Sequence, residues 1–238
     1  MRGAVGLPGT RPENGPWLRV DEAFSDQMAV RTRLLQEVQD DVVYCEKDAQ
    51  DAVIELLSEA IEVACTHLGY AREGDGIRRP DGRLINLANP LSALGHLFQN
   101  DFVVMEKRGD EHALTAAVLC FPASWSLAEK ASHGLLRIHA PVASYDDQIS
   151  KRVQRLFDGV QVGRPLWRFN RLWYETAELY QPRTEDGRRD LARETHFMRC
   201  ERQTLVRMPK TQAVVFAIHT YVLPKTTALE QLELNDPA

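Results

Sequence analysis

The spacing of apolar residues predicts helices in the first part of the chain. Residues Asp48–Leu68 carry an apolar side chain every three or four positions, with acidic residues between them. This spacing is typical of an amphipathic helix, and Gly69 is a natural place for it to end. We expect a further helix over Val20–Val43 and a short one over Leu91–Gln99. The stretch between them, residues 72–83, is rich in turn-forming residues.

The pattern changes at Asp101, where strand-like segments begin. Phe102–Met105 and Leu114–Phe121 predict two strands joined by a hairpin turn. Phe197–Met208 and Ala213–Leu223 predict a second pair, also joined by a short connection. Strands joined in this way pair antiparallel, so we predict an α+β fold in which helices pack on an antiparallel sheet.

Three further elements are expected between the two strand pairs. Ser126, with Glu129 three residues later, predicts a capped short helix that ends at Gly134. Leu135–Val142 resembles a strand, and the apolar positions of Ser144–Gly159 predict another helix.

Composition and charge exclude several classes of protein. The chain has 29 Lys and Arg against 34 Asp and Glu, a net charge of −5, and 44% hydrophobic residues. Such values argue against disorder, and the acidic balance gives no basic face for nucleic acid. The longest apolar run, Ala116–Ala123, is far shorter than the roughly 20 residues that cross a bilayer, so we expect no membrane span.

The chain is expected to form one domain over residues 17–228. Residues 1–16, rich in Gly and Pro, are predicted to be a disordered leader without the apolar stretch of a secretory signal, and residues 229–238 a tail. No two cysteines form a CxxC pair, which favours buried, reduced thiols in a cytoplasmic protein. The cysteines are Cys45, Cys65, Cys120 and Cys200.

His139 is the histidine with the most suggestive context. In a strand, Arg137 and His139 would share one face. A neutral imidazole can bind iron, and a neighbouring arginine can pair with a carboxylate such as a haem propionate. The alternative is an ordinary strand histidine at a half-buried site.

A second polar segment, Arg199–Leu205, lies in a predicted strand. Alternation places Arg199, Glu201 and Gln203 on one face and Arg202 on the other. Such residues are costly to bury, so they either face water or build a polar site with a paired acid and base. A third segment, Pro165–Trp173, alternates aromatic and arginine residues and suits core packing or the wall of a pocket for a flat ligand.

Several short motifs, taken together and in order, resemble a known family. The chain is similar to the haem-dependent oxidative N-demethylase, α (haem) subunit-like proteins, formerly a domain of unknown function, from about residue 18 to 224. The matching stretches are Leu18–Glu22, Asn100–Met105, Val118–Trp125, Lys130, Ile138–Val142, Arg199–Pro209, Val215–Ile218 and Thr220–Tyr221.

The resemblance implies a PAS-like curved antiparallel sheet that holds haem b. It implies an oxidoreductase that uses O2 to oxidise a small secondary amine to an imine, which water splits into formaldehyde and the demethylated amine. The 238 residues contain no reductase or folate module. A separate flavin or iron–sulfur reductase and a tetrahydrofolate-binding chain are therefore implied partners.

The resemblance also suggests roles for individual residues. His139 is the candidate axial ligand of the iron. Whether Arg199, Glu201 and Arg202 serve the substrate side or anchor the propionates stays open. The candidates are Arg199 and Glu201 for catalysis, and His139, Arg137, Arg202 and Asn170 for cofactor binding.

Two positions depart from the family pattern. Ala143 stands where another proline is usual, and Arg171 stands where a tryptophan is expected, with Trp173 two residues on. If that tryptophan packs on the cofactor, its absence would weaken haem binding. Two other interpretations therefore stay open: a haem-binding PAS-like sensor without turnover, and a degenerate scaffold that binds no cofactor.

Overall fold

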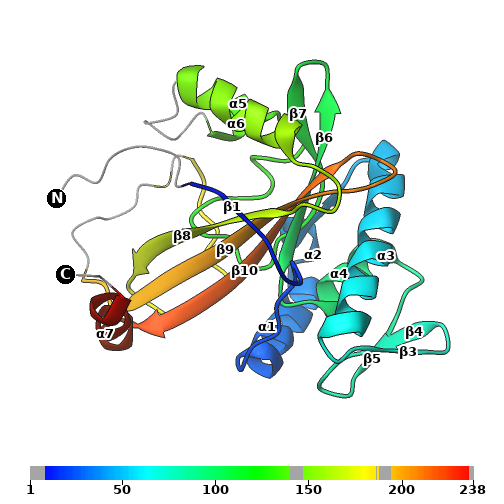
Figure 1. The fold of residues 1–238 in the computed structure, drawn as a ribbon. Helices are drawn as coiled ribbons and strands as arrows, with labels where there is room; N and C mark the ends of the chain where they lie inside the picture. Colours follow the sequence, from blue (N-terminus) through cyan, green and yellow to red (C-terminus); the bar gives the residue numbers. More distant parts are fainter. Residues whose placement is uncertain (1–8, 140–146, 186, 188–193, 236–238) are drawn as a thin grey trace.

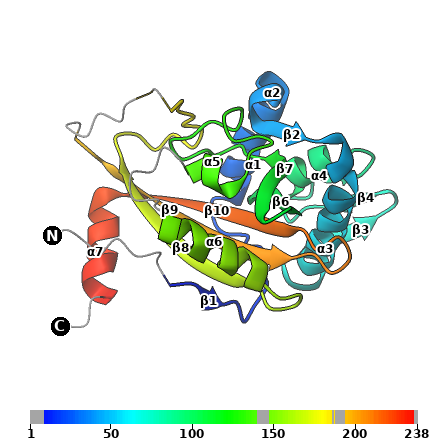
Figure 2. The same cartoon turned by 90° about the horizontal axis from the view of Figure 1, so that it is seen from above.

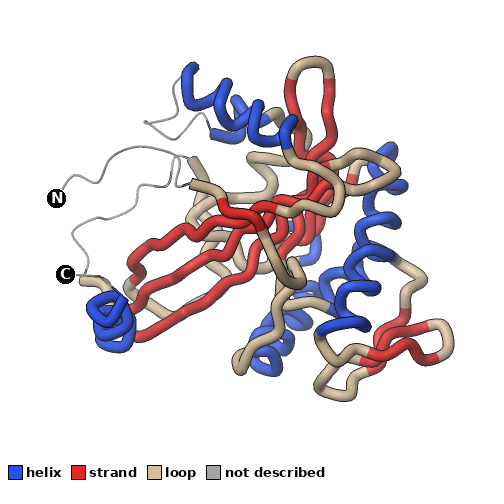
Figure 3. The backbone as a smooth tube through the Cα atoms, in the orientation of Figure 1, coloured by secondary structure: helices blue, strands red, loops and turns tan. Residues whose placement is uncertain are grey.

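A large antiparallel sheet forms the centre of the molecule (Figure 1). The computed structural model describes residues 9–139, 147–185, 187 and 194–235. In this part of the chain the sheet has seven strands, in the order β1-β8-β9-β10-β6-β7-β2. They are β1 (Arg11–Pro12), β2 (Val43–Cys45), β6 (Asp101–Arg108), β7 (Glu111–Val118), β8 (Leu166–Tyr174), β9 (Phe197–Arg207) and β10 (Val214–Pro224). A smaller sheet of β3 (Ala71–Glu73), β4 (Gly76–Arg78) and β5 (Leu84–Asn86) lies apart from it (Figure 3).

Helices cover both faces of the large sheet. In Figure 1, α3 and α4 lie on the opposite side of the strands from α5 and α6. None of the described helices is both long and apolar enough to cross a membrane. The helices are α1 (Phe24–Glu37), α2 (Gln39–Val42), α3 (Gln50–His67), α4 (Pro90–Leu97), α5 (Leu135–His139), α6 (Asp147–Gly159) and α7 (Lys225–Asn235), with a 3-10 turn, η1 (Lys47–Ala49), before α3.

Alternation along the central strands separates two hydrophobic cores. On β6, Phe102 and Val104 pack into one cluster of buried side chains, whereas Val103 and Met105 pack into another. Successive strand residues point to opposite faces, so one strand serves both cores.

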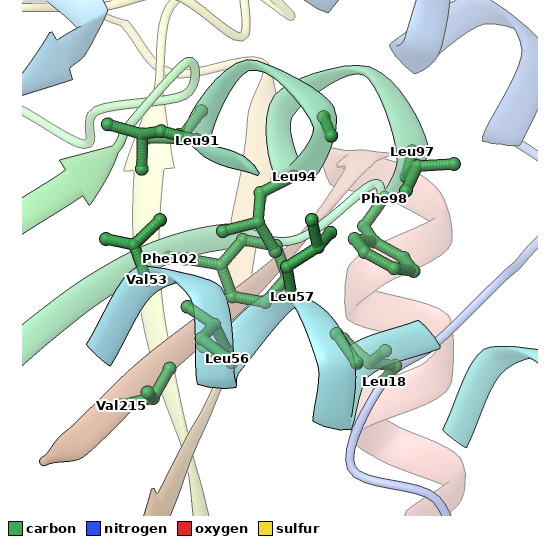
Figure 4. Close-up of a cluster of buried hydrophobic side chains, with 14 of the residues drawn as sticks. Leu18, Val53, Leu56, Leu57, Leu91, Leu94, Leu97, Phe98, Phe102 and Val215 are labelled. Carbon is green, nitrogen blue, oxygen red and sulfur yellow. The ribbon is translucent and has the colours of Figure 1, made fainter. Parts of the chain in front are cut away.

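The larger core lies between the sheet and the helices α1, α3 and α4. The apolar stripe of α3 includes Val53, Leu56 and Leu57, all of which are buried. In Figure 4 these side chains converge with Leu94 of α4 and Phe102 of β6. This packing confirms the amphipathic helix predicted over Asp48–Leu68.

The second core lies on the other face, beneath α5 and α6. Leu135, Val153 and Phe157 from these helices pack with Leu205 of β9 and Ile218 of β10. In the view from above, α6 crosses over β8 and β9 (Figure 2). A cavity also lies on this face of the sheet.

The structure confirms the α+β class and both strand pairs. It also confirms the helices predicted over Asp48–Leu68 and Leu91–Gln99. Two predictions at residues 126–142 are wrong. Residues 126–134 form turns rather than a helix, and Leu135–His139 is a short helix, α5, rather than a strand. The remainder of that predicted strand, from residue 140, lies outside the described residues.

The single helix predicted over Val20–Val43 is also wrong. It is divided into α1 and α2, and the chain then enters β2. Prediction missed β8 and α7. Within the predicted leader, β1 pairs with β8, where Arg11 lies opposite Trp167.

Candidate functional site

A cavity of about 720 Å³ lies between the sheet and the helices α5 and α6. This volume is within the usual range for small-molecule and cofactor sites. Its walls are mainly apolar, and the apolar side chains come from both the strands and the two helices. They include Val103, Met105, Leu114, Leu135, Ile138, Ile149, Val153, Leu156, Phe157, Leu172, Leu205, Phe216 and Ile218.

The polar wall of the cavity is built by the neighbouring strands β8 and β9. Arg168 and Asn170 of β8 and Glu201 and Gln203 of β9 line the cavity. The antiparallel register places Asn170 opposite Glu201 and Arg168 opposite Gln203. The predicted alternation of the Arg199–Leu205 segment is therefore confirmed, and its polar face is buried rather than solvated.

Glu201 is a carboxylate buried within this wall, with 6% of its surface exposed. Gln203 Nε2 donates a hydrogen bond to Glu201 Oε2 at 3.1 Å. Arg199 Nη2 lies 3.4 Å from Glu201 Oε1. Burial raises the pKa of Glu201, and the Arg199 charge and the hydrogen bonds of Gln203 and Asn170 oppose this shift only in part.

Arg199 supports Glu201 but does not line the cavity. Its side chain is 2% exposed. Its guanidinium donates to the carbonyl oxygen of Leu179 at 2.8 Å and to that of Phe121. These main-chain partners fix the guanidinium independently of Glu201.

His139 lines the cavity from the end of α5. Its Nδ1 lies 2.9 Å from the carbonyl oxygen of Leu135. Since a carbonyl only accepts, Nδ1 carries the proton and donates it. Burial lowers the pKa of His139 below its usual value, so the imidazole is neutral near pH 7. In this tautomer Nε2 carries the lone pair.

Arg168 brings a cation into the cavity. Burial lowers the pKa of its guanidinium. Its Nε is buried and has no hydrogen-bond partner among the described residues. A buried donor without a partner is costly, and an anionic ligand would satisfy it.

Glu185 holds two other cations near the cavity. Lys130 Nζ and Arg137 Nη1 each donate to Glu185 Oε1 at 2.7 Å. These hydrogen bonds lower the pKa of Glu185 to about 2. Its backbone N–H donates to both carboxylate oxygens of Glu129 at 3.1 Å. Lys130 is therefore paired inside the wall, and Arg137 is about half exposed and does not line the cavity.

Arg202 lies on the opposite face of the sheet. It stacks 4.8 Å from the ring centre of Trp167, donates to Thr204 Oγ1 at 2.9 Å and pairs with Glu13. Of the six predicted site residues, three line the cavity, Arg199 supports one of them, and two lie elsewhere. The three are His139, Asn170 and Glu201.

Comparison with models of known protein families finds a match over nearly the whole chain. The model of the family described as haem-dependent oxidative N-demethylase, alpha subunit-like matches residues 10–235. The chain belongs to this family. The match confirms the resemblance drawn from the short motifs and extends beyond them at both ends.

The cavity of this N-demethylase family member fits the haem on which the family depends. Neutral His139 offers the kind of nitrogen that binds haem iron. Arg168 offers an unsatisfied donor for a haem carboxylate. The apolar side chains that line most of the cavity suit the faces of a flat macrocycle.

The departure of this family member at Arg171 does not affect the cavity. Arg168 and Asn170 face the cavity, whereas Arg171 is exposed and lies on the same face as Trp167. A side chain at this position therefore does not contact a ligand in the cavity. The other departure, Ala143, lies outside the described residues.

Several polar residues of the wall were not among the predicted site residues, and they include Arg168, Gln203 and Lys130. Arg168 and Gln203 share the cavity-facing parity of Asn170 and Glu201, so strand alternation was the signal that identifies them. Lys130 follows a turn that the sequence presents as a helix, and no local pattern shows that it reaches the cavity.

Proposed function

We propose that this chain binds haem b in the cavity and catalyses oxidative N-demethylation of a small secondary amine. The observation that carries the proposal is the combination, in one apolar cavity, of a neutral imidazole and a half-buried guanidinium whose buried Nε has no hydrogen-bond partner among the described residues. Family membership supports the haem dependence. We further propose that the curved sheet is an adapted PAS-like fold.

His139 is the proposed axial ligand. Its Nδ1–H donates to the carbonyl oxygen of Leu135, which orients the ring. Histidines that bind metals commonly donate their other ring nitrogen in this way.

Arg168 and Asn170 are the proposed partners of the haem carboxylates. Both line the same wall, and the guanidinium charge complements an anion. The cofactor roles considered for Arg137 and Arg202 are not part of the proposal, because Arg137 pairs with Glu185 and Arg202 lies on the other face of the sheet.

The proposed reaction needs an electron donor besides the amine. Bound haem supplies the reduction of O2 to water. Two electrons come from the N–CH3 group and two from a separate flavin or iron–sulfur reductase. The amine becomes an imine, and water adds to the C=N bond to release formaldehyde and the demethylated amine. A separate tetrahydrofolate-binding chain is the proposed acceptor of formaldehyde, and the cytoplasm is the proposed location.

Product formation tests this proposal. Haem-loaded protein is reduced chemically, mixed with dimethylamine, O2 and further reductant so that two external electrons are available for each O2, and assayed for formaldehyde and methylamine. We expect the two products in equal amounts, and neither without the amine. If the reduced haem is reoxidised at the same rate with and without dimethylamine and no formaldehyde forms, the protein is a sensor rather than an enzyme. If the protein takes up no haem, it is a scaffold.

A further inference from the structure

We propose that Glu111 is a positioning residue for His139 and that its carboxylate acts on the imidazole through one peptide group, the one between Leu135 and Leu136. This inference rests on the proposed function for the role of His139 as axial ligand. It reaches beyond the cavity wall, because Glu111 is not a lining residue. It follows from the hydrogen bonds at the start of α5.

Both sides of this peptide group form hydrogen bonds. Its N–H, on Leu136, donates to Glu111 Oε1. Its carbonyl oxygen, on Leu135, accepts from His139 Nδ1 at 2.9 Å. A peptide group is planar, so the direction of its N–H also fixes the direction of its carbonyl. Glu111 therefore helps to fix the acceptor that orients the His139 ring.

The helix α5 is too short to hold this peptide group in place by itself. It has five residues, Leu135–His139, and helices of this length depend on tertiary contacts. The chain before it is attached to β7, since Leu114 N–H donates to the carbonyl of His133 and Ser132 N–H donates to the carbonyl of Leu114, both at 3.0 Å. Glu111 adds an acceptor within the first turn, where the N–H groups lack partners inside the helix.

Gly134 allows the carboxylate to approach α5. A Cβ atom at this position would overlap the carboxylate group of Glu111. The φ angle of Gly134 lies outside the left-handed region, so the backbone conformation does not itself require glycine. The missing side chain therefore serves the approach of Glu111. Gly134→Ala should displace the carboxylate while Glu111 itself stays unchanged.

The charge of Glu111 should strengthen the whole chain of hydrogen bonds. Arg108 lies opposite Glu111 in the β6–β7 hairpin, but it pairs with Glu46 and Asp48. Hydrogen bonds to an ionised acceptor are the stronger ones, and linked hydrogen bonds polarise one another. The carboxylate therefore makes the Leu135 carbonyl a better acceptor for the imidazole N–H. A better acceptor at one ring nitrogen makes histidine a more basic metal ligand through the other.

Haem-loaded variants test this role. Glu111→Ala should bind haem about tenfold more weakly than the wild type, the lower end of the losses typical of outer partners of a ligand. The reduction potential should rise, and the iron–histidine band in the resonance Raman spectrum of reduced protein should move to lower frequency, because the imidazole donates less electron density. Glu111→Gln keeps an acceptor oxygen without the charge, so it should restore the affinity and the band in part.

Gly134→Ala gives an independent test that holds even if Glu111→Ala fails to fold. It should reproduce the shifts of Glu111→Ala, and the double variant should show no further shift. Glu106→Ala is the matched control, since Glu106 is also a half-buried glutamate of this hairpin but accepts from Thr115 Oγ1. An unchanged band and potential in Glu111→Ala or Gly134→Ala, or equal shifts in Glu106→Ala, overturns the inference.

A measurement on haem-free protein separates this inference from the proposed function. Nitrogen-15 NMR of the histidine rings, assigned with His139→Gln, gives the tautomer of His139. We expect the Nδ1–H tautomer in the wild type and in Glu111→Gln, and a mixture with the Nε2–H tautomer in Glu111→Ala. The same tautomer in all three proteins overturns the inference. Failure of the wild type to take up haem would instead contradict the proposed function, while the tautomer still tests Glu111.

Discussion

Arg168 and His139 approach the cavity from different elements, one from β8 and the other from α5. Each is predicted to contribute a distinct interaction with haem. Because the two interactions differ in chemistry, one with a carboxylate and one with iron, separate measurements distinguish them.

Replacement of Arg168 by Leu should weaken haem binding without preventing it. The lost charge-assisted hydrogen bond corresponds to about 1.5–3 kcal/mol, which is roughly a 10- to 100-fold loss of affinity. Haem titration followed by absorbance measures this change. Arg171→Leu is the control on the same strand, because Arg171 is exposed and faces away from the cavity. Equal effects of the two substitutions would show that general charge, not Arg168, is responsible.

Haem retention should depend on pH through His139. A proton competes with iron for the imidazole, so binding is strong only while the ring is neutral. Because burial lowers the His139 pKa from its ordinary value of 6.5, retention should stay constant above pH 6.5 and decline at lower pH. The Soret absorbance of samples between pH 4.5 and 8, with circular dichroism as a check of folding, measures this. A decline that begins above pH 6.5 would contradict the assignment.

Among the elements, α6 covers the cavity and is attached to β7 by two hydrogen bonds. Gln154 Oε1 accepts from the His112 backbone N–H at 3.2 Å, and Gln154 Nε2 donates to His112 Nδ1 at 2.7 Å. One amide therefore binds both the main chain and the side chain of His112.

Loss of these hydrogen bonds should weaken the attachment of α6 to the sheet and accelerate haem release. Gln154→Ala removes hydrogen bonds worth about 0.5–1.5 kcal/mol each, so we expect release to be several-fold to roughly 10-fold faster. Transfer of haem to apomyoglobin gives the rate. Arg155→Ala, at the exposed neighbouring position, should leave it unchanged. Equal rates for Gln154→Ala and the wild type would show that α6 does not control release.

The helix α1 is attached to the sheet by a fully buried ion pair. Arg31 Nη1 lies 2.6 Å from Asp101 Oδ1, and the two side chains are 0% and 1% exposed. Asp101 also accepts from the backbone N–H groups of Cys120 and Phe121. Asp101→Asn leaves the guanidinium without a counter-charge and should destabilise the protein by about 3–5 kcal/mol. Urea unfolding measures this, and a loss below 1 kcal/mol would contradict it.

Elements in which apolar residues recur at a regular spacing could be predicted from the sequence, whereas elements defined by tertiary contacts could not. The α3 stripe and the two hairpin-like pairs are local patterns, and they are confirmed. Leu135–Val142 suggested a strand because its residues are mostly β-compatible, but its start is the short helix α5. The strand β8 was missed because its mixture of aromatic and arginine residues is not a simple apolar–polar alternation: Arg168 and Asn170 lie on one face, and Arg171 lies on the other.

At the scale of the whole molecule, the two faces of the sheet differ in what they carry. One face carries the larger core with α1, α3 and α4, and the other carries the cavity beneath α5 and α6. The sequence could indicate His139, Asn170 and Glu201 as candidates, since they lie in recognisable motifs, and the structure brings all three to the cavity. Strand alternation already placed Arg202 on the opposite face from Glu201. The sequence could not show which face carries the cavity, or that Arg137 pairs with Glu185, because both depend on how the chain packs in three dimensions.

A haem titration of the whole chain followed by its absorption spectrum tests the central claim most directly. We predict a Soret band that saturates at one haem per chain, is displaced or lost in His139→Ala, and is unchanged in His67→Ala, whose histidine is exposed at the end of α3. Absence of a Soret band in the wild type, or an identical band in His139→Ala, would contradict the claim that the cavity binds haem through His139.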